Sequence, residues 1–167
     1  LLLTAFGFVF INISAVLQFE VDYFIENGLS EVTAASLLGL TGGAGGLGKI
    51  FFGYMADRTS PKTGMIFSLT VQMLAIVLLL NAGPVFVWGF AVIYGFSMGA
   101  QLALQPLLIG QFYGNTAFGT LLGLVAAAGA AGTAIGPLLA GHLRDAAVSY
   151  TWIFSGCIGC TGLALLA

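Results

Sequence analysis

The stretch that decides the fold of this chain is Gly53-Tyr54-Met55-Ala56-Asp57-Arg58-Thr59-Ser60-Pro61-Lys62. Upstream of it, the run from Ala34 to Met55 is apolar and rich in glycine, and Lys49 is its one ionisable residue. Downstream, a second apolar run begins at Thr63. About 20 apolar residues in a helix are enough to cross the roughly 30 Å hydrocarbon core of a bilayer. We therefore interpret the stretch as a short charged turn between two membrane-spanning helices.

The composition of the whole chain excludes a soluble domain. Of its 167 residues, 59% are hydrophobic and 6% are charged, and the mean hydropathy is +1.08. A soluble domain carries about 25% charged residues, so this chain cannot cover its surface with side chains that water solvates. The net charge of -2 provides no basic surface for a nucleic acid. We expect a multi-pass integral membrane protein in contact with the lipid bilayer of a plasma membrane or a bacterial inner membrane.

Six apolar segments are separated by short breaks that carry turn residues or charges. They predict an all-α membrane protein with one six-helix transmembrane domain, residues 1–167. The predicted spans are approximately 1–23, 32–56, 63–81, 84–112, 118–142 and 151–167. Because both ends of the chain lie inside apolar runs, we expect a segment of a longer protein or the ordered part of one.

The charges of the loops predict how these helices are oriented. Arg58 and Lys62 share the loop after the second helix, whereas the first loop carries Glu26 and Glu31 and no basic residue. Basic loops stay on the cytoplasmic side of a membrane. The Arg58 loop is therefore expected in the cytoplasm, and Arg144 falls on the outer side.

The sequence gives no indication of an enzyme. No set of residues has metal-ligand spacing, and no nucleophile is paired with a base, so we predict no metal and no cofactor. Cys157 and Cys160 have the spacing of a redox dithiol, but they lie in an apolar run and are interpreted as packing residues. A six-helix channel is unsupported, because the chain has no Asn-Pro-Ala motif.

The charged turn also carries a family resemblance. Gly53, Asp57, Arg58 and Lys62 form the pattern Gly-x-x-x-Asp-Arg-x-x-x-Lys, which resembles the cytoplasmic-loop signature of the major facilitator superfamily. Glycine lets two helices approach closely, and the Asp and Arg side chains can cap helix ends and pair across them. The resemblance implies a transporter in which these residues gate the cytoplasmic side.

A second glycine pattern lies in the predicted fifth helix. Gly132, Gly136, Pro137 and Gly141 resemble the glycine-proline pattern of the fifth and eleventh helices of that superfamily. Small residues at these spacings let helix backbones touch, and the proline introduces a kink. We predict helix packing at these positions, and bending of this helix during transport is compatible with it.

Within the superfamily, the chain resembles the C-terminal six-helix half of a monocarboxylate-transporter-like member of the oxalate/formate type. The resemblance rests on residues 23–30, 48–58, 105–114 and 118–123. It implies two inverted three-helix repeats, with the substrate site at mid-membrane facing a second six-helix half. It also implies that Lys49 replaces a substrate-binding arginine, and that Gly45 stands where an acidic partner is expected.

Lys49 is the most informative candidate site residue. An ammonium group at membrane depth costs about 2.5–3.5 kcal/mol on insertion scales. Lys49 lies about 12 Å along the helix from Asp57 at 1.5 Å per residue, too deep for easy escape from hydrocarbon. We predict that it faces a polar cavity and binds the substrate or takes part in ion coupling, although a lysine can also extend its ammonium group to the interface.

Other polar residues lie within the predicted spans. Gln101 and Gln105 are four residues apart and share a helix face, and Asn12, Ser14 and Gln18 lie on the first helix. We name Gln101, Gln105, Asn12 and Gln18 as candidate substrate-binding residues, although such side chains also act as hydrogen bonds between helices. Gln72 and Thr41 are expected to link helices. Glu20 and Asp22 are expected to be solvated charges.

The sequence thus favours half of a secondary active transporter, a symporter of small organic anions that works by alternating access with a coupling ion. Its partners would be the anion, the ion and the second half of the same protein. The alternative is a non-transporting structural subunit, derived from a transporter, within a larger complex of membrane subunits. Six further helices beside this chain would favour the transporter, and unrelated subunits would favour the alternative.

Overall fold

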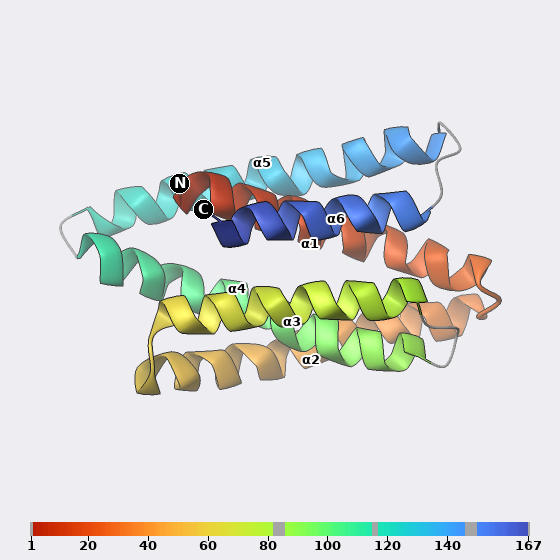
Figure 1. The fold of residues 1–167 in the computed structure, drawn as a ribbon, viewed down its shortest axis with the longest axis horizontal. Helices are drawn as coiled ribbons and strands as arrows, with labels where there is room; N and C mark the ends of the chain where they lie inside the picture. The colour runs from red at the N-terminus through yellow and green to blue at the C-terminus, as the bar shows by residue number, and fades with distance from the viewer. Residues whose placement is uncertain (1, 82–85, 115–116, 146–149, 167) are drawn as a thin grey trace. The chain divides into compact units, whose positions relative to one another are not determined.

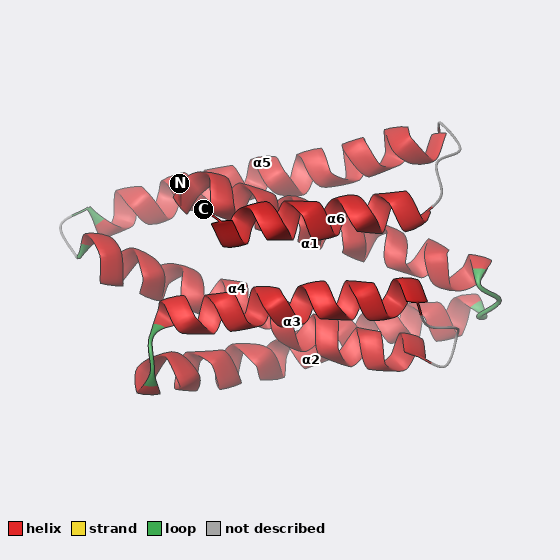
Figure 2. Cartoon of the chain, viewed as in Figure 1, coloured by secondary structure: helices red, strands yellow, loops and turns green. Residues whose placement is uncertain are grey.

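The computed structural model describes residues 2–81, 86–114, 117–145 and 150–166. Within these residues the chain is almost entirely helical and contains no strand (Figure 1 and Figure 2). The helices are α1 (Leu2–Glu26), α2 (Glu31–Arg58), α3 (Pro61–Asn81), α4 (Val87–Tyr113), α5 (Phe118–Asp145) and α6 (Tyr150–Leu166). The predicted all-α architecture of six helices is confirmed.

Turn and capping residues fix where the first helices end and begin. Ser30 accepts the backbone N–H of Thr33 at 3.2 Å at the start of α2, and Ser60 accepts that of Thr63 at 3.2 Å at the start of α3. Serine at this position satisfies an N–H group that the first turn of a helix leaves unpaired. Gly28 follows α1 with φ of +90°, a conformation that glycine adopts without steric cost. Serine caps and a glycine turn thus separate α1 from α2 and α2 from α3.

By length and composition, four of the helices can cross a membrane: α1, α4, and the parts of α3 and α5 over Pro61–Leu80 and Phe118–Leu139. α6 is apolar but shorter, over Tyr150–Leu165. α2 is long enough, but its glycines and Lys49 lower its hydropathy. α6 therefore differs from the other four helices in its length, and α2 differs from them in its glycine content.

The helices form two compact units. Unit 1 comprises Leu1–Ala34 and Leu124–Ala167, and contains α1, most of α5, and α6. Unit 2 comprises Ala35–Gly123, and contains most of α2 together with α3 and α4. Within unit 1, α1 packs along α6, and within unit 2, α3 packs along α4.

Glycines bring α2 and α4 into backbone contact in unit 2. A Cβ atom on Gly48 would overlap the carbonyl oxygen of Phe96 and lie 2.9 Å from its carbonyl carbon. A Cβ on Gly99 would overlap the carbonyl oxygen of Gly45 and lie 2.9 Å from the backbone N of Lys49. Only glycine fits at such contacts, which provide the close packing that membrane helices need in place of a hydrophobic driving force.

In unit 1, glycines of α5 meet α1. A Cβ on Gly132 would lie 2.7 Å from the carbonyl oxygen of Gly7, and one on Gly136 would lie 2.6 Å from that of Ile11. The Ser14 hydroxyl donates to the Gly132 carbonyl at 3.4 Å, which joins the same two helices. Pro137 follows directly within α5.

Each of the two units combines one helix of one three-helix repeat with two helices of the other. In a chain of two three-helix repeats, α1 corresponds to α4, α2 to α5, and α3 to α6. Unit 1 then pairs α1 with α5 and α6, and unit 2 pairs α4 with α2 and α3. The order Gly-x-x-x-x-Gly-x-x-x-Asp also occurs in both glycine-rich helices, as Gly48, Gly53, Asp57 and as Gly136, Gly141, Asp145. An odd number of spans per repeat inverts the second repeat across a membrane, as the predicted fold class requires.

Candidate functional site

α2 presents glycines on two sides. Gly45 and Gly48 are buried against α4, whereas Gly42, Gly43 and Gly46 are exposed, with nothing within 4 Å of the Cβ atom each lacks. We call the exposed side, defined by Gly42, Gly43, Gly46 and Lys49, the open glycine face. Residues three and four positions apart lie on one side of a helix, which places Gly42, Gly46 and Lys49 in one row.

Lys49 stands at the end of this row. Its side chain is exposed, while its backbone N–H lies at the close contact with Gly99 of α4. The only acidic residue in Ala35–Gly123 is Asp57, about 12 Å further along α2. Within its own unit Lys49 therefore has no carboxylate nearer along the chain than Asp57, and its charge lies on a helix side that carries the exposed glycines together with the exposed side chain of Ile50.

The candidate glutamines are buried in α4. Gln101 is fully buried, and its side-chain amide forms a hydrogen bond of 3.1 Å with the side-chain amide of Gln72 on α3. Gln105 is 6% exposed. The pair of Gln101 and Gln72 links α3 to α4, which is the role expected for Gln72, and it occupies the Gln101 amide in this conformation.

The two candidate substrate-binding residues of α1, Asn12 and Gln18, differ in burial. Asn12 is fully buried, and its Nδ2 donates to the carbonyl oxygen of Cys157 at 2.8 Å and to the hydroxyl of Thr161, both on α6. Gln18 is exposed. Asn12 is thus the counterpart in unit 1 of the Gln101–Gln72 contact in unit 2, because each links the first helix of a repeat to the third helix of the other.

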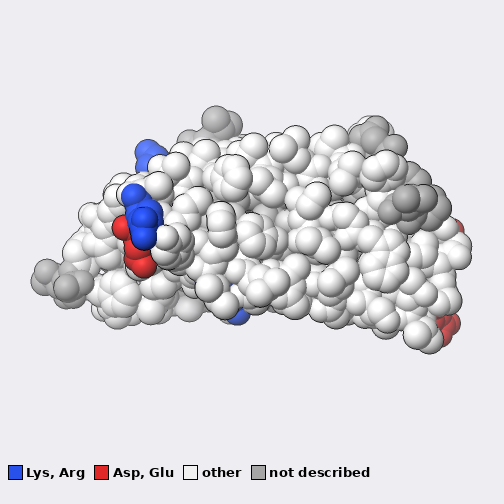
Figure 3. All heavy atoms as spheres, turned by 90° about the horizontal axis from the view of Figure 1, so that it is seen from below, with Lys and Arg blue, Asp and Glu red and all other residues white. Residues whose placement is uncertain are grey.

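The turn between α2 and α3 is exposed and charged. Asp57, Arg58 and Lys62 are exposed, and the guanidinium carbon of Arg58 lies 4.9 Å from the centroid of the Tyr54 ring. A Cβ on Gly53 would meet nothing within 4 Å. On the face drawn in Figure 3, charged atoms gather in a few places, and most of the surface between them is uncharged. The hydrocarbon core of a bilayer does not solvate charged side chains, so helices with long uncharged sides can lie within it.

The expectation that Glu20 is a solvated charge is wrong. Glu20 is 0% exposed, whereas Asp22, two residues away, is exposed as expected. Glu20 lies four residues from Val16 and four from Phe24, both 0% exposed, so it belongs to the buried side of α1. The same spacing leads back from Val16 to Asn12, and this i, i+4 series in the sequence was the signal for the burial of Glu20.

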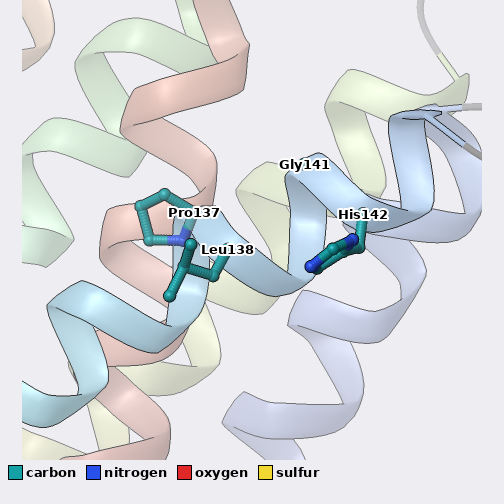
Figure 4. Close-up of a pocket in the computed structure, with 4 residues that line it drawn as sticks. All are labelled: Pro137, Leu138, Gly141 and His142. Carbon is teal, nitrogen blue, oxygen red and sulfur yellow. The ribbon is translucent and has the colours of Figure 1, made fainter.

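Pro137, Leu138, Gly141 and His142 of α5 line a shallow hollow (Figure 4). Figure 4 shows His142 and Leu138 as separate side chains on one helix, and His142 is exposed. A Cβ on Gly141 would meet nothing within 4 Å. In the part of the chain that the structure describes, no three His, Cys, Asp or Glu side chains are grouped so that they could hold a metal ion.

Comparison with known proteins gives the chain its family. The family model described as "Major Facilitator Superfamily" matches residues 1–167. The chain is 33% identical over 150 residues to "MFS-type transporter opdF" of Penicillium oxalicum, covering 85% of this chain and 35% of that protein. It is 29% identical over 150 residues to human "Monocarboxylate transporter 12", covering 86% of this chain and 29% of that protein.

The chain therefore spans about a third of the length of the curated relatives it matches. The family match, the apolar helices and the glycine contacts between them agree with a multi-pass integral membrane protein. The chain belongs to the Major Facilitator Superfamily.

Proposed function

We propose that this chain is the C-terminal six-helix half of a secondary active transporter that moves a small organic anion of the monocarboxylate class by alternating access. A second six-helix half would supply the other wall of the transport path. A proton or sodium gradient would drive the movement. The proposal is supported by family membership and by relatives whose names describe them as MFS-type or monocarboxylate transporters.

The observation that carries the proposal is Lys49 on the open glycine face. A cation at this depth is stabilised either by a partner or by water in a cavity, because hydrocarbon does not solvate it. Its own unit contributes no acidic side chain nearer than Asp57. An anionic substrate that enters along the exposed glycines can approach the ammonium group closely. Lys49 is thus proposed to attract and bind the carboxylate of the substrate.

The polar side chains of the other candidates have different roles in the proposal. Gln18 is exposed and can donate a hydrogen bond to a substrate without rearrangement. Gln101, Gln105 and Asn12 are buried in this conformation. Their proposed contact with the substrate requires the helices to move, which alternating access provides.

Uptake of labelled short-chain organic acids by the complete protein in proteoliposomes tests the role of Lys49. Lys49→Gln keeps hydrogen bonding but removes the charge, so affinity should fall by about 30-fold or more, the effect of losing about 2 kcal/mol of a charge pair. Lys49→Arg is the matched control, because it restores the charge and can bind both carboxylate oxygens. It should retain uptake.

Equal uptake by the wild type and Lys49→Gln would remove Lys49 from the mechanism. Absence of uptake by the wild type, with every acid tested, would contradict the transporter and favour a structural subunit of a larger membrane complex. Copurification of other membrane subunits in place of a second six-helix half would give the same answer independently.

The turn of Gly53, Asp57, Arg58 and Lys62 is proposed to gate the cytoplasmic side. These exposed charges lie at the end of α2 and the start of α3, where a conformational change can make and break contacts at helix ends. Asp57→Asn should then slow turnover more than it weakens substrate binding. Unchanged turnover, measured by uptake at saturating substrate, would contradict the gating role.

A further inference from the structure

A pair of buried amides joins α3 to α4 in unit 2. Gln72 of α3 and Gln101 of α4 are both 0% exposed, and the contact between their side-chain amides is 3.1 Å long. Gln105 lies four residues further along α4 on the same side of the helix, and 6% of its surface is exposed. Gln101, a residue proposed to donate to the substrate, is therefore bound to a partner that the proposed site does not use.

The direction of the hydrogen bond in this pair follows from the atoms around it. A side-chain amide carries an oxygen and an NH2 group at nearly equivalent positions, so each amide has two orientations. If Gln101 donates to Gln72, the Nε2 of Gln72 has no partner among the described residues. If both amides are turned, Gln72 donates to the Gln101 oxygen across the same contact, and Gln101 Nε2 donates to the carbonyl oxygens of Ser97, at 2.8 Å, and Met98. A buried N–H group is costly to leave unpaired, so the second orientation is favoured.

In this orientation the amide of Gln101 is bound on both sides. Its nitrogen donates to two carbonyl groups of its own helix, and its oxygen accepts from Gln72. A carboxylate accepts hydrogen bonds and has no proton to donate, so a substrate carboxylate needs the Gln101 nitrogen. Gln72 thus stabilises the position of Gln101 in which that nitrogen is directed to protein acceptors.

We propose that Gln72 is a positioning residue that binds Gln101 in the substrate-free state and competes with the substrate for it, an inference that rests on the proposed transporter function. When a carboxylate binds, the Gln101 nitrogen exchanges the carbonyl oxygens of α4 for a carboxylate oxygen, and the contact with Gln72 breaks. Only hydrogen bonds change in this step. A protein whose binding-competent state is less populated has a lower apparent affinity, so the contact with Gln72 weakens substrate binding.

Uptake of labelled short-chain organic acids by the complete protein in proteoliposomes tests the proposal through KM and the maximal rate. Gln72→Met removes the amide but keeps a long unbranched side chain, so Gln101 loses this partner in the substrate-free state. KM should fall by about two- to tenfold, the factor that corresponds to the net contribution of one hydrogen bond. Gln101→Met removes the donor to the substrate and should raise KM by about tenfold.

Ser68→Ala is the matched control on α3. Ser68 lies four residues before Gln72 and is also 0% exposed, but its hydroxyl donates to the Met65 carbonyl of its own helix at 3.0 Å. KM of this variant should equal that of the wild type. Gln72→Asn keeps the amide on a side chain one methylene group shorter and should lower KM by a smaller factor, which tests the proposal even if Gln72→Met is not recovered folded.

The double variant separates this role from a merely structural one. Gln72→Met combined with Gln101→Met should have the KM of Gln101→Met alone, because no amide remains to be released. A residue that only packs α3 against α4 would lower yield or maximal rate without raising affinity. Thermal unfolding in detergent is independent of transport: the double variant should lose less stability than the sum of the single variants, because each single variant leaves one buried amide without its partner.

Several results would overturn the assignment of Gln72 while the transporter stands. They are an unchanged or raised KM in folded Gln72→Met, an unchanged KM in Gln101→Met, and unfolding effects that simply add. Absence of uptake by the wild type, with every acid tested, is a different result. It would contradict the proposed function and the assignment of Gln72 together.

Discussion

On one side of α2, Gly45 and Gly48 press against the backbone of α4, and on the other side Gly42, Gly43 and Gly46 have nothing within 4 Å. The packed glycines have a steric reason, since a Cβ on Gly48 would overlap the Phe96 carbonyl oxygen and one on Gly45 would lie 3.3 Å from the Gly95 carbonyl oxygen. The exposed glycines have none, although each is about 0.8–1 kcal/mol less favourable than alanine inside a helix. Under the proposed function, these glycines would leave clearance for a substrate that passes along this face toward Lys49.

The largest effect is expected where a side chain meets backbone on the packed side. Gly48→Ile places a branched side chain on the Phe96 carbonyl, and should prevent recovery of folded protein, because overpacking costs about 1–3 kcal/mol even where flexible side chains can yield. Gly43→Ile is the control on the open glycine face and should fold. Yield of monodisperse protein after detergent extraction measures the difference, and equal yields would abolish the distinction between the two sides.

The next effect compares two glycines of α5 that contact α1. The Cβ of Gly132→Ala would lie 2.7 Å from the backbone oxygen of Gly7, whereas that of Gly129→Ala would lie 2.9 Å from the ring of Phe10, which can rotate away. Gly132→Ala should destabilise the protein by about 1–3 kcal/mol, and Gly129→Ala by less than about 1 kcal/mol. Thermal unfolding in detergent orders the two variants, and the reverse order would show that contact with backbone is not decisive.

A bulky residue on the open glycine face tests whether that face is functional. Gly46→Leu should leave thermal stability close to wild type, because the Cβ position is unobstructed, and should lower uptake by about tenfold by filling the space beside Lys49. Gly46→Ala should have a much smaller effect on uptake. Full activity of Gly46→Leu would indicate that this face meets lipid and not the transport path.

The smallest effect is expected at the polar contact between α1 and α6. Thr161→Val removes the hydroxyl that Asn12 contacts, while Asn12 keeps the Cys157 carbonyl at 2.8 Å. Hydrogen bonds between membrane helices contribute about 0.6 kcal/mol on average. A loss of that size in unfolding free energy is expected, and a loss as large as that of Gly132→Ala would show that polar contacts, and not glycine contacts, determine the packing of this unit.

Much of the fold was predictable because its signals are local. Apolar length and the breaks between apolar runs predicted the six helices, and the structure adds the caps at Ser30 and Ser60 and the turn at Gly28 that separate the first three. The glycine-rich character of α2 and α5 was visible as well. Each of these features depends on neighbours within a few residues in the chain.

The candidate site was less predictable, because burial depends on which helices meet. Glu20 and Asp22 look alike in the sequence, yet one is buried and the other exposed. Gln101 and Gln72 were assigned different roles, and the structure places them in contact. An i, i+4 pattern shows that polar residues share a side of a helix, but it does not show what that side contacts.

The sequence by itself determined that this protein is a set of six membrane helices joined by short turns, because hydropathy and capping act over short distances along the chain. Only the tertiary structure decided that α1 packs with α5 and α6, and α4 with α2 and α3. It also decided which glycines of α2 are packed and which are open. These outcomes depend on contacts between residues far apart in the chain, where the shapes of both helices determine how closely they approach.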